Sequence, residues 1–131
     1  MGIALNDETR RLLDGRHYAV LATLNADGGP QTSAMWVGRD GDDVLMSTLE
    51  GRRKHRNLLR DPRASVTILD ADPENYVELR GRVTIEPDVD RAFDTSLSWK
   101  YDGRDPDPDP PGAVRVVLRL VVDKATGYAA A

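Results

Sequence analysis

Residues 47–66 read STLEGRRKHRNLLRDPRASV and decide how the surrounding chain is organised. Ser47 and Thr48 end an apolar run, and the segment from Arg52 to Arg60 then holds five Lys or Arg residues, one His and no acid. Asp61-Pro62 ends this short helix, because the residue before a proline is disfavoured in helical backbone. In a chain of formal net charge -4, so many cations in one turn are a candidate site for an anion such as a phosphate.

Helical periodicity divides the basic segment into two faces. One face carries the arginines at i, i+3 and i+7, namely Arg53, Arg56 and Arg60; the other carries Lys54, Asn57 and Leu58. Because Leu58 should point toward the core, we expect Lys54 and Asn57 to lie near the body of the protein and the three arginines to face water. On spacing alone, both an anion site and an ordinary solvated face remain open.

Two further features favour the anion site. Ser47 and Thr48 place hydroxyl donors at the end of the preceding strand, and the start of the helix offers free N–H groups and a favourable dipole. The charged groups of such a site would be Arg52 and Lys54.

Length and composition limit the number of domains and the classes of partner that the chain can have. With 131 residues and 40% hydrophobic content, the chain suits one domain, 1–131, with a small core. It contains no Cys, starts without a signal-like segment and has no run of about 20 apolar residues, so we expect a cytoplasmic protein with no membrane partner. A pI of about 5.1 and 5% aromatic residues argue against nucleic acid as a partner.

Outward from the basic helix, the pattern predicts a mainly β protein with small helices (β+α). Helices are expected over 6–14 and 87–101, and a proline-rich acidic loop over 102–112. Strands are expected over 18–24, 30–38, 44–48, 64–69, 76–85 and 113–122. Six antiparallel strands favour a closed or nearly closed barrel, here a six-stranded split β-barrel with flanking helices. Because side chains fill so small a barrel, a binding site should lie on its outside or between subunits, which favours a homodimer.

Other chemistries find little support. The two histidines, His17 and His55, do not form a metal-binding pattern, so no metal site is expected. His55 itself is expected to be an ordinary polar helix residue. No serine has a G-x-S-x-G context for nucleophilic catalysis.

The motifs in their order resemble the flavin/deazaflavin oxidoreductase family, whose split barrel is similar to that of pyridoxamine 5'-phosphate oxidase, and in particular its short branch that uses the deazaflavin coenzyme F420. The residues that carry the resemblance are 20–24, 27–33, Ser47-Thr48, 52–58, 61–65, Gly81 and 114–122. The similarity covers residues 12–128.

The resemblance implies a homodimer with cofactor sites at the subunit interface. It assigns the cofactor phosphate to Arg52 and Lys54, with Asn57 nearby, and strand-end contacts to Ser47 and Thr48. The strand beside the ring carries Gln31, Ser33, Met35 and Trp36, and Tyr76 would approach from the other subunit. The expected cofactor is coenzyme F420, with FMN as the alternative.

The activity implied is hydride transfer from reduced deazaflavin to a small unsaturated or conjugated acceptor, with Tyr76, Tyr101 or solvent as proton donor. The alternatives are an FMN-dependent oxidoreductase like pyridoxamine phosphate oxidase and a non-catalytic protein that binds F420 or FMN. The chain lacks the C-terminal Trp-Arg pattern of the oxidase, which speaks against pyridoxamine phosphate as substrate.

Overall fold

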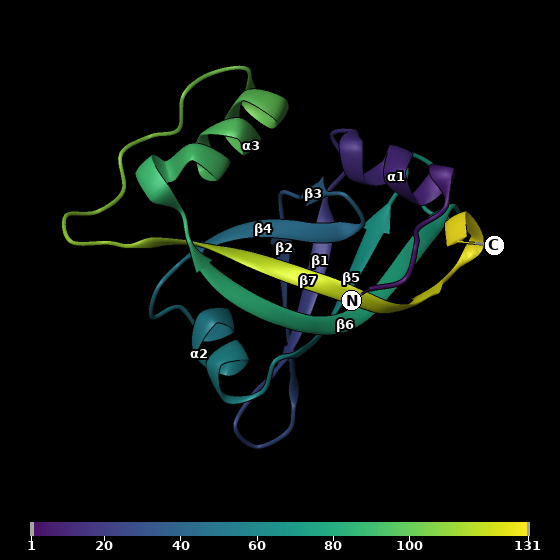
Figure 1. Ribbon diagram of the computed structural model, residues 1–131, viewed down its shortest axis with the longest axis horizontal. Coiled ribbons are helices and arrows are strands. Elements are labelled where there is room, and N and C mark those ends of the chain that lie inside the picture. The colour runs from purple at the N-terminus through teal and green to yellow at the C-terminus, as the bar shows by residue number, and fades with distance from the viewer. Residues whose placement is uncertain (1, 131) are drawn as a thin grey trace.

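Seven antiparallel strands form one curved sheet in the computed structural model, which describes residues 2–130 (Figure 1). The strands are β1 (Ala19–Leu24), β2 (Pro30–Met35), β3 (Gly38–Asp40), β4 (Asp43–Leu49), β5 (Arg63–Leu69), β6 (Tyr76–Pro87) and β7 (Arg115–Thr126). Their order across the sheet is β2-β1-β5-β6-β7-β4-β3. The two edge strands, β2 and β3, follow each other in the chain, so the sheet curls back on itself as an open barrel.

The prediction of six strands was wrong by one. The expected strand over 30–38 breaks after Met35, and β3 begins at Gly38. The cause is Tyr101, whose hydroxyl accepts a hydrogen bond of 3.1 Å from the Val37 N–H. Its ring also stacks on Trp36, with 5.0 Å between centroids and 6° between planes. These contacts take the two residues out of the ladder and turn the chain between the sheet edges.

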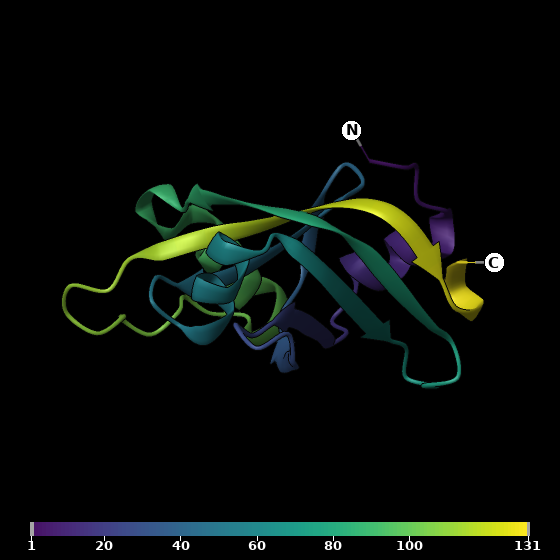
Figure 2. The same ribbon diagram turned by 90° about the horizontal axis from the view of Figure 1, so that it is seen from below.

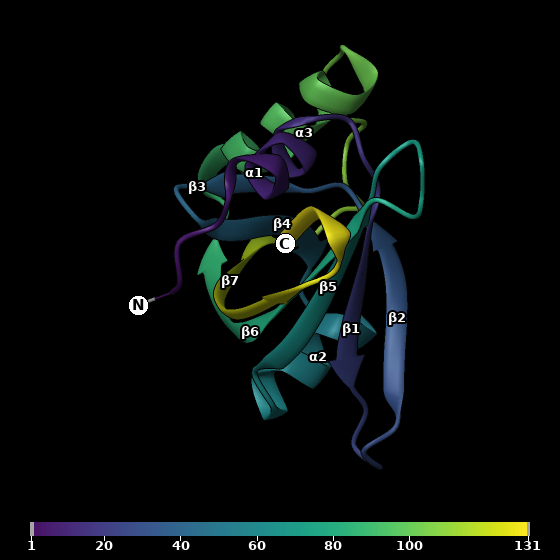
Figure 3. The ribbon, with the colours of Figure 1, turned by 90° about the vertical axis from the view of Figure 1, so that its right-hand side faces the viewer.

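Three helices flank the sheet: α1 (Asp7–Asp14), α2 (Arg53–Arg60) and α3 (Ala92–Asp102). Short 3-10 turns, η1 (Val89–Arg91) and η2 (Tyr128–Ala130), precede α3 and follow β7. Figure 3 shows α1 and α3 toward one end of the barrel and α2 toward the other. The helix predicted over 87–101 begins five residues later than expected, at Ala92. Asp88 explains the start, because its carboxylate accepts hydrogen bonds of 2.9 Å from the N–H groups of Phe93 and Asp94.

The core lies inside the curved sheet and beneath α1. Leu12 and Leu13 of α1 are fully buried there, and Asn6 caps the helix by accepting a hydrogen bond of 2.8 Å from the Thr9 N–H. The largest side chains from the strands that fill the interior are Leu21, Met46, Ile68, Leu79, Leu118 and Leu120. Side chains fill the barrel, so ligand space must be sought on its outer surface.

The proline-rich segment after α3 runs over the surface as a loop from 103 to 114. Figure 2 shows it reaching away from the sheet, at the opposite end of the molecule from the two termini. It returns to the sheet at Arg115, the first residue of β7. The loop therefore joins α3 to the strand that pairs with both β4 and β6.

Candidate functional site

The basic helix α2 begins directly after β4, across a turn at Gly51 with a φ of +88°. Arg52 is its N-cap, yet no side chain caps the helix and no acid lies in its first turn. The first N–H groups of a helix lack intrahelical partners. This end of α2 therefore offers donors and a positive dipole end to a ligand, flanked by Arg52 and Lys54.

The rotation of α2 about its axis agrees with the predicted division into two faces. Asn57 and Leu58 are buried, Lys54 is half-buried, and Arg53 and Arg56 are exposed. Arg60 is exposed but is also bonded, since its guanidinium donates to the Leu24 carbonyl at 2.6 Å. The helix thus presents Lys54 along the protein surface and keeps two arginines in water.

His55 was expected to be an ordinary polar helix residue, and the structure gives it a specific role. Its side chain is buried, and its Nδ1 accepts a hydrogen bond of 3.0 Å from the Gly51 N–H. This bond holds the turn that precedes α2. The spacing of four residues between Gly51 and His55 is the sequence signal that could have indicated the contact.

A groove of about 290 Å³ lies between α2 and α3, beside the ends of β2 and β4. Its volume is close to the lower end of the range for small-molecule sites, about 300 Å³. The lining combines aromatic and apolar residues with cations and hydroxyls: Tyr18, Ala34, Met35, Trp36, Ser47, Thr48, Arg52, Lys54, Asp94, Leu97 and Arg115.

Lys54 is an unpaired cation in this groove. Within residues 2–130 its ammonium makes no hydrogen bond or ion pair. Burial, and to a lesser degree the neighbouring Arg52, lower the pKa of Lys54 below its ordinary value. An anion placed between the two cations would offset both effects, because an opposite charge nearby favours the charged form of Lys54.

Thr48 adds an unsatisfied hydroxyl to the same groove. Its Oγ1 is buried and, among the residues that the structure describes, has no hydrogen-bond partner. A buried polar atom without a partner costs free energy. The hydroxyl therefore fits a groove completed by a ligand that accepts or donates a hydrogen bond at this point.

Arg115 is a groove residue that the sequence analysis missed. Its guanidinium donates to the Ser47 hydroxyl at 3.3 Å and forms ion pairs with Asp109 and Asp94. The signal available in the sequence was an arginine at the point where the proline-rich loop meets the apolar run of β7.

Six of the predicted site residues meet in the groove: Met35, Trp36, Ser47, Thr48, Arg52 and Lys54. Gln31 and Ser33 lie outside its lining, although they share one face of β2 with Met35, because they stand farther along the strand from the end that borders the groove. There Gln31 accepts a hydrogen bond of 3.2 Å from Thr23. Asn57 is also outside, with its amide bonded to Thr23 and Asn25 at 3.0 Å each.

Tyr76, the remaining predicted residue, lies on the outer face of the sheet and not in the groove of its own chain. We define the outer face by the outward residues of β1 and β2, which are uncharged: Val20, Ala22, Leu24, Thr32 and Ala34. Tyr18, Leu69 and Tyr76 continue this face at one end and are 62%, 40% and 36% exposed. Tyr18 and Ala34 belong both to this face and to the groove.

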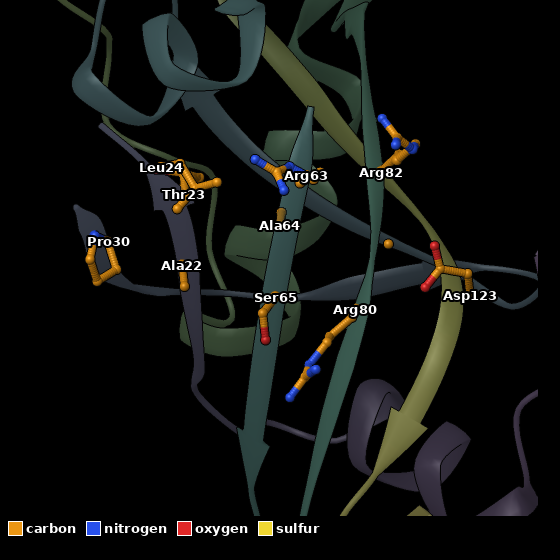
Figure 4. Close-up of a pocket in the computed structure, with 11 residues that line it drawn as sticks. Ala22, Thr23, Leu24, Pro30, Arg63, Ala64, Ser65, Arg80, Arg82 and Asp123 are labelled. Carbon is orange, nitrogen blue, oxygen red and sulfur yellow. The ribbon is translucent and has the colours of Figure 1, made fainter. Parts of the chain in front are cut away.

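A second hollow, of about 330 Å³, opens on the same side of the sheet farther along β5 and β6. Figure 4 shows Arg63, Arg80 and Arg82 around it, together with Ala22 on β1 and Ser65 on β5. Arg80 and Arg63 are paired with Glu78 and Asp61. The outer face is therefore apolar toward β2 and charged toward β6.

Two other features are absent from residues 2–130, a metal site and a membrane-spanning helix. No group of three or more His, Cys, Asp or Glu side chains is arranged to hold a metal ion. No helix in this range has the length and apolar character needed to cross a bilayer.

Comparison with protein families matches residues 5–127 of the chain to the family described as pyridoxamine 5'-phosphate oxidase. The chain belongs to the pyridoxamine 5'-phosphate oxidase family. The resemblance found in the sequence motifs is thereby confirmed at the level of the family, and the open, curled sheet is the split barrel of that family.

Several proteins are similar to this member of the family. The F420H(2)-dependent biliverdin reductase of Mycobacterium tuberculosis (strain CDC 1551 / Oshkosh) is 26% identical over 125 residues, which span 95% of this chain and 89% of the relative. A solved structure named F420 Reductase is 34% identical, with a TM-score of 0.79 and coverage of 89% of this chain and 94% of that one. A putative pyridoxamine 5'-phosphate oxidase from Listeria innocua, 20% identical with a TM-score of 0.73 over 92% and 94% of the two chains, shares the fold.

Proposed function

We propose that this protein is a coenzyme F420-dependent reductase that passes a hydride from reduced deazaflavin to a small unsaturated or conjugated acceptor. One observation carries the proposal. Lys54 is a half-buried cation without a partner among residues 2–130, in a groove that also holds the unsatisfied hydroxyl of Thr48. The two relatives named for F420 dependence or F420 reduction support the choice of this cofactor.

The residues present fit a cofactor phosphate. Arg52 and Lys54 would supply charge, the Ser47 and Thr48 hydroxyls would complete the hydrogen bonding, and the first N–H groups of α2 would add further donors. Each of these groups lies at the end of β4 or the start of α2. This cluster therefore fixes one end of the ligand.

The aromatic part of the groove fits a planar ring. Trp36 is held rigidly by its stack on Tyr101, while Met35 and Ala34 provide apolar surface beside it. When bound, the deazaflavin supplies the hydride chemistry. The role of the chain is to orient the ring and to keep water from the face on which the acceptor is reduced.

Tyr101 does not suit the role of proton donor. Its hydroxyl already donates a hydrogen bond of 2.6 Å to the His17 carbonyl. Burial raises its pKa above the ordinary value, which makes its proton harder to release. We therefore propose that solvent, or Tyr76 from a second subunit, supplies the proton.

A homodimer is part of the proposal. The outer face is uncharged along β1 and β2 and exposes Tyr18, Val20, Leu69 and Tyr76, which is the composition expected of a surface that another copy covers. Because Tyr18 and Ala34 also line the groove, a second copy bound to this face would form one side of the groove. Residues of that copy would then lie next to the cofactor.

The cofactor is tested by equilibrium titration of the purified protein with oxidised F420, reduced F420 and FMN, followed by ring fluorescence. We expect both forms of F420 to bind more tightly than FMN. Tighter binding of FMN would favour the flavin-dependent alternative, and failure of both to bind below roughly millimolar concentration would overturn the proposal.

Catalysis is tested by steady-state oxidation of reduced F420 in the presence of a panel of conjugated acceptors. Turnover supports a reductase. Tight binding without turnover of any acceptor would favour the non-catalytic alternative.

The dimer is tested by light scattering of the Val20→Glu variant, with Thr84→Glu on the exposed side of β6 as the matched control. Val20→Glu should shift the mass toward that of the monomer. A monomeric wild-type protein would overturn the homodimer.

A further inference from the structure

Asp109, in the proline-rich loop, is bound to a cation of the groove. Its carboxylate accepts two hydrogen bonds of 2.9 Å from the Arg115 guanidinium, which gives a bidentate ion pair. The third contact of the same guanidinium is the Ser47 hydroxyl in the groove, at 3.3 Å. Arg115 therefore stands between the loop and the proposed cofactor site.

A second arginine reaches the same carboxylate. Arg91 lies 3.3 Å from Asp109 and 2.5 Å from Asp94, and Asp94 in turn lies 3.5 Å from Arg115. We call these four residues, Arg91, Asp94, Asp109 and Arg115, the ion-pair ring. Two cations and two anions balance within it, so the ring presents no net charge while it stays closed.

Asp109 is held in its charged form by this surrounding. The Arg115 hydrogen bonds lower the pKa of Asp109 most, and the charges of Arg91 and Arg52 act in the same direction. The influence of Arg52 ties the carboxylate to the cation cluster at the start of α2. Asp109 is thus a negatively charged group of the protein itself, bound at the edge of the groove that we propose binds an anionic ligand.

The backbone at Arg91, a member of the ion-pair ring, has an unusual conformation. Asp90 and Arg91 have φ values of 57° and 54°, in the left-handed region that non-glycine residues rarely adopt. The Asp88 cap of α3 and the contacts of Arg91 hold this conformation. Such conformations persist where the surroundings determine them, and they often mark functional positions.

A cavity of about 310 Å³ adjoins the groove and shares Trp36, Asp94 and Arg115 with it, while the loop forms its other wall. The loop is fastened at its start by bonds from Trp99 to Asp105, at 2.8 Å, and from Ser98 to the Arg104 carbonyl, at 2.6 Å. Release of Asp109 would therefore open this wall without detaching the base of the loop.

We propose that Arg115 and Arg91 form a second anion subsite beside the cofactor phosphate, closed by Asp109, and that a carboxylate or phosphate elsewhere on the same ligand opens it by taking the place of Asp109. The inference rests on the proposed function, since the ligand would be F420 with its anionic tail. A ligand with a single phosphate, such as FMN, would leave the ring closed. Asp109 thereby determines specificity for ligands with a second anionic group.

Titrations with F420 and FMN compare the wild-type protein with Asp109→Asn and Asp107→Asn. Asp107 is the matched control, because it lies in the same loop, loses the same charge and pairs with the exposed Arg104. Asp109→Asn should tighten F420 binding by about three- to tenfold and leave FMN binding within about twofold, since an open subsite raises only the affinity of a ligand that uses it. Asp107→Asn should change neither affinity.

The same comparison in an Arg115→Gln background isolates the subsite. Without Arg115, the substitution Asp109→Asn should no longer tighten F420 binding. Weaker F420 binding by Asp109→Asn, equal changes for both ligands, or tightening that persists without Arg115 would overturn the proposal.

Hydrogen–deuterium exchange at the amides of Asp107, Asp109 and Gly112, which lie beyond the fastened base of the loop, follows the loop without any cofactor. Inorganic tripolyphosphate should accelerate this exchange in the wild-type protein and not in Arg115→Gln, each relative to its own rate without the anion. No acceleration in the wild-type protein would overturn the second subsite whether or not F420 binds. Acceleration in a protein that binds neither F420 nor FMN would overturn the proposed function alone.

Discussion

Asn57 on α2 donates a hydrogen bond of 3.0 Å to the Thr23 hydroxyl on β1, and this contact fixes the rotation of the basic helix. The same amide donates to Asn25 at 3.0 Å and accepts from Arg60 at 3.1 Å. Asn57 is 1% exposed; its bond to Thr23 is buried, and its bonds to Asn25 and Arg60 are partly buried. The residue positions Lys54 in the groove through the helix, without lining the groove itself.

Replacing Asn57 with Ala should lower the free energy of unfolding by about 1–3 kcal/mol, because Thr23 and Asn25 would lose buried partners. Urea unfolding followed by circular dichroism measures the change. Arg53→Ala on the exposed face of α2 is the control and should stay within about 0.5 kcal/mol of the wild type. Equal stabilities of the two variants would show that the buried amide does not anchor α2.

Thr48→Val should have opposite effects on stability and on binding. Without ligand, removal of an unsatisfied buried hydroxyl should leave the free energy of unfolding unchanged or raise it by up to about 1 kcal/mol. With F420, the variant should bind about 1 kcal/mol more weakly, since a hydrogen bond is lost. Thermal unfolding and fluorescence titration separate the two effects, and unchanged affinity would remove Thr48 from the site.

Gly81→Ala should destabilise the barrel severely. The register between β6 and β7 shifts at Arg80/Gly81, and a Cβ on Gly81 would lie 1.9 Å from the Val121 carbonyl oxygen. Relief requires movement of the backbone, so we expect a loss of about 3 kcal/mol or more, or failure to fold. Thr84→Ala on the same strand is the control. A thermal midpoint of Gly81→Ala within a few degrees of the control would contradict this close approach.

Acid stability should depend on Glu78. The Arg80 pair and the hydrogen bonds from Ser65 and Thr126 lower the pKa of Glu78 from 4.5 to about 2. A lowered pKa means that the contribution is complete above pH 4.5 and is lost as the pH falls toward 2. Glu78→Gln should therefore reduce the loss of stability across this pH range, measured by urea unfolding at successive pH values. An unchanged slope would show that Glu78 has a similar pKa in the unfolded chain.

The faces of α2 could be predicted because they depend on local geometry. Spacing of three and four residues was enough to place Leu58 and Asn57 inward and Arg53 outward. The same reasoning placed Lys54 beside the body of the protein, where burial now lowers its pKa. The strand expected over 76–85 could be predicted for the same reason, and β6 covers Tyr76–Pro87, with Val77 and Leu79 buried and Arg80 exposed.

The features that the sequence did not predict depend on contacts between residues far apart in the chain. Val37 leaves the ladder because of Tyr101, 64 residues away, and Ser47 meets Arg115 across 68 residues. Alternation also could not show which end of β2 borders the groove: Met35 lines it, while Gln31 and Ser33, on the same face, lie farther along the strand. Periodicity reports the two faces of a strand but does not say what each of them meets.

The most direct test of the account is the affinity of Lys54→Ala for F420, measured by fluorescence titration beside Arg53→Ala. Loss of one charge-assisted contact to the phosphate should weaken binding by about 1.5–3 kcal/mol, or roughly tenfold to 150-fold. Arg53, its exposed neighbour, should change the affinity by no more than about twofold. An F420 affinity of Lys54→Ala equal to that of the wild-type protein would contradict the assignment of the phosphate to this groove.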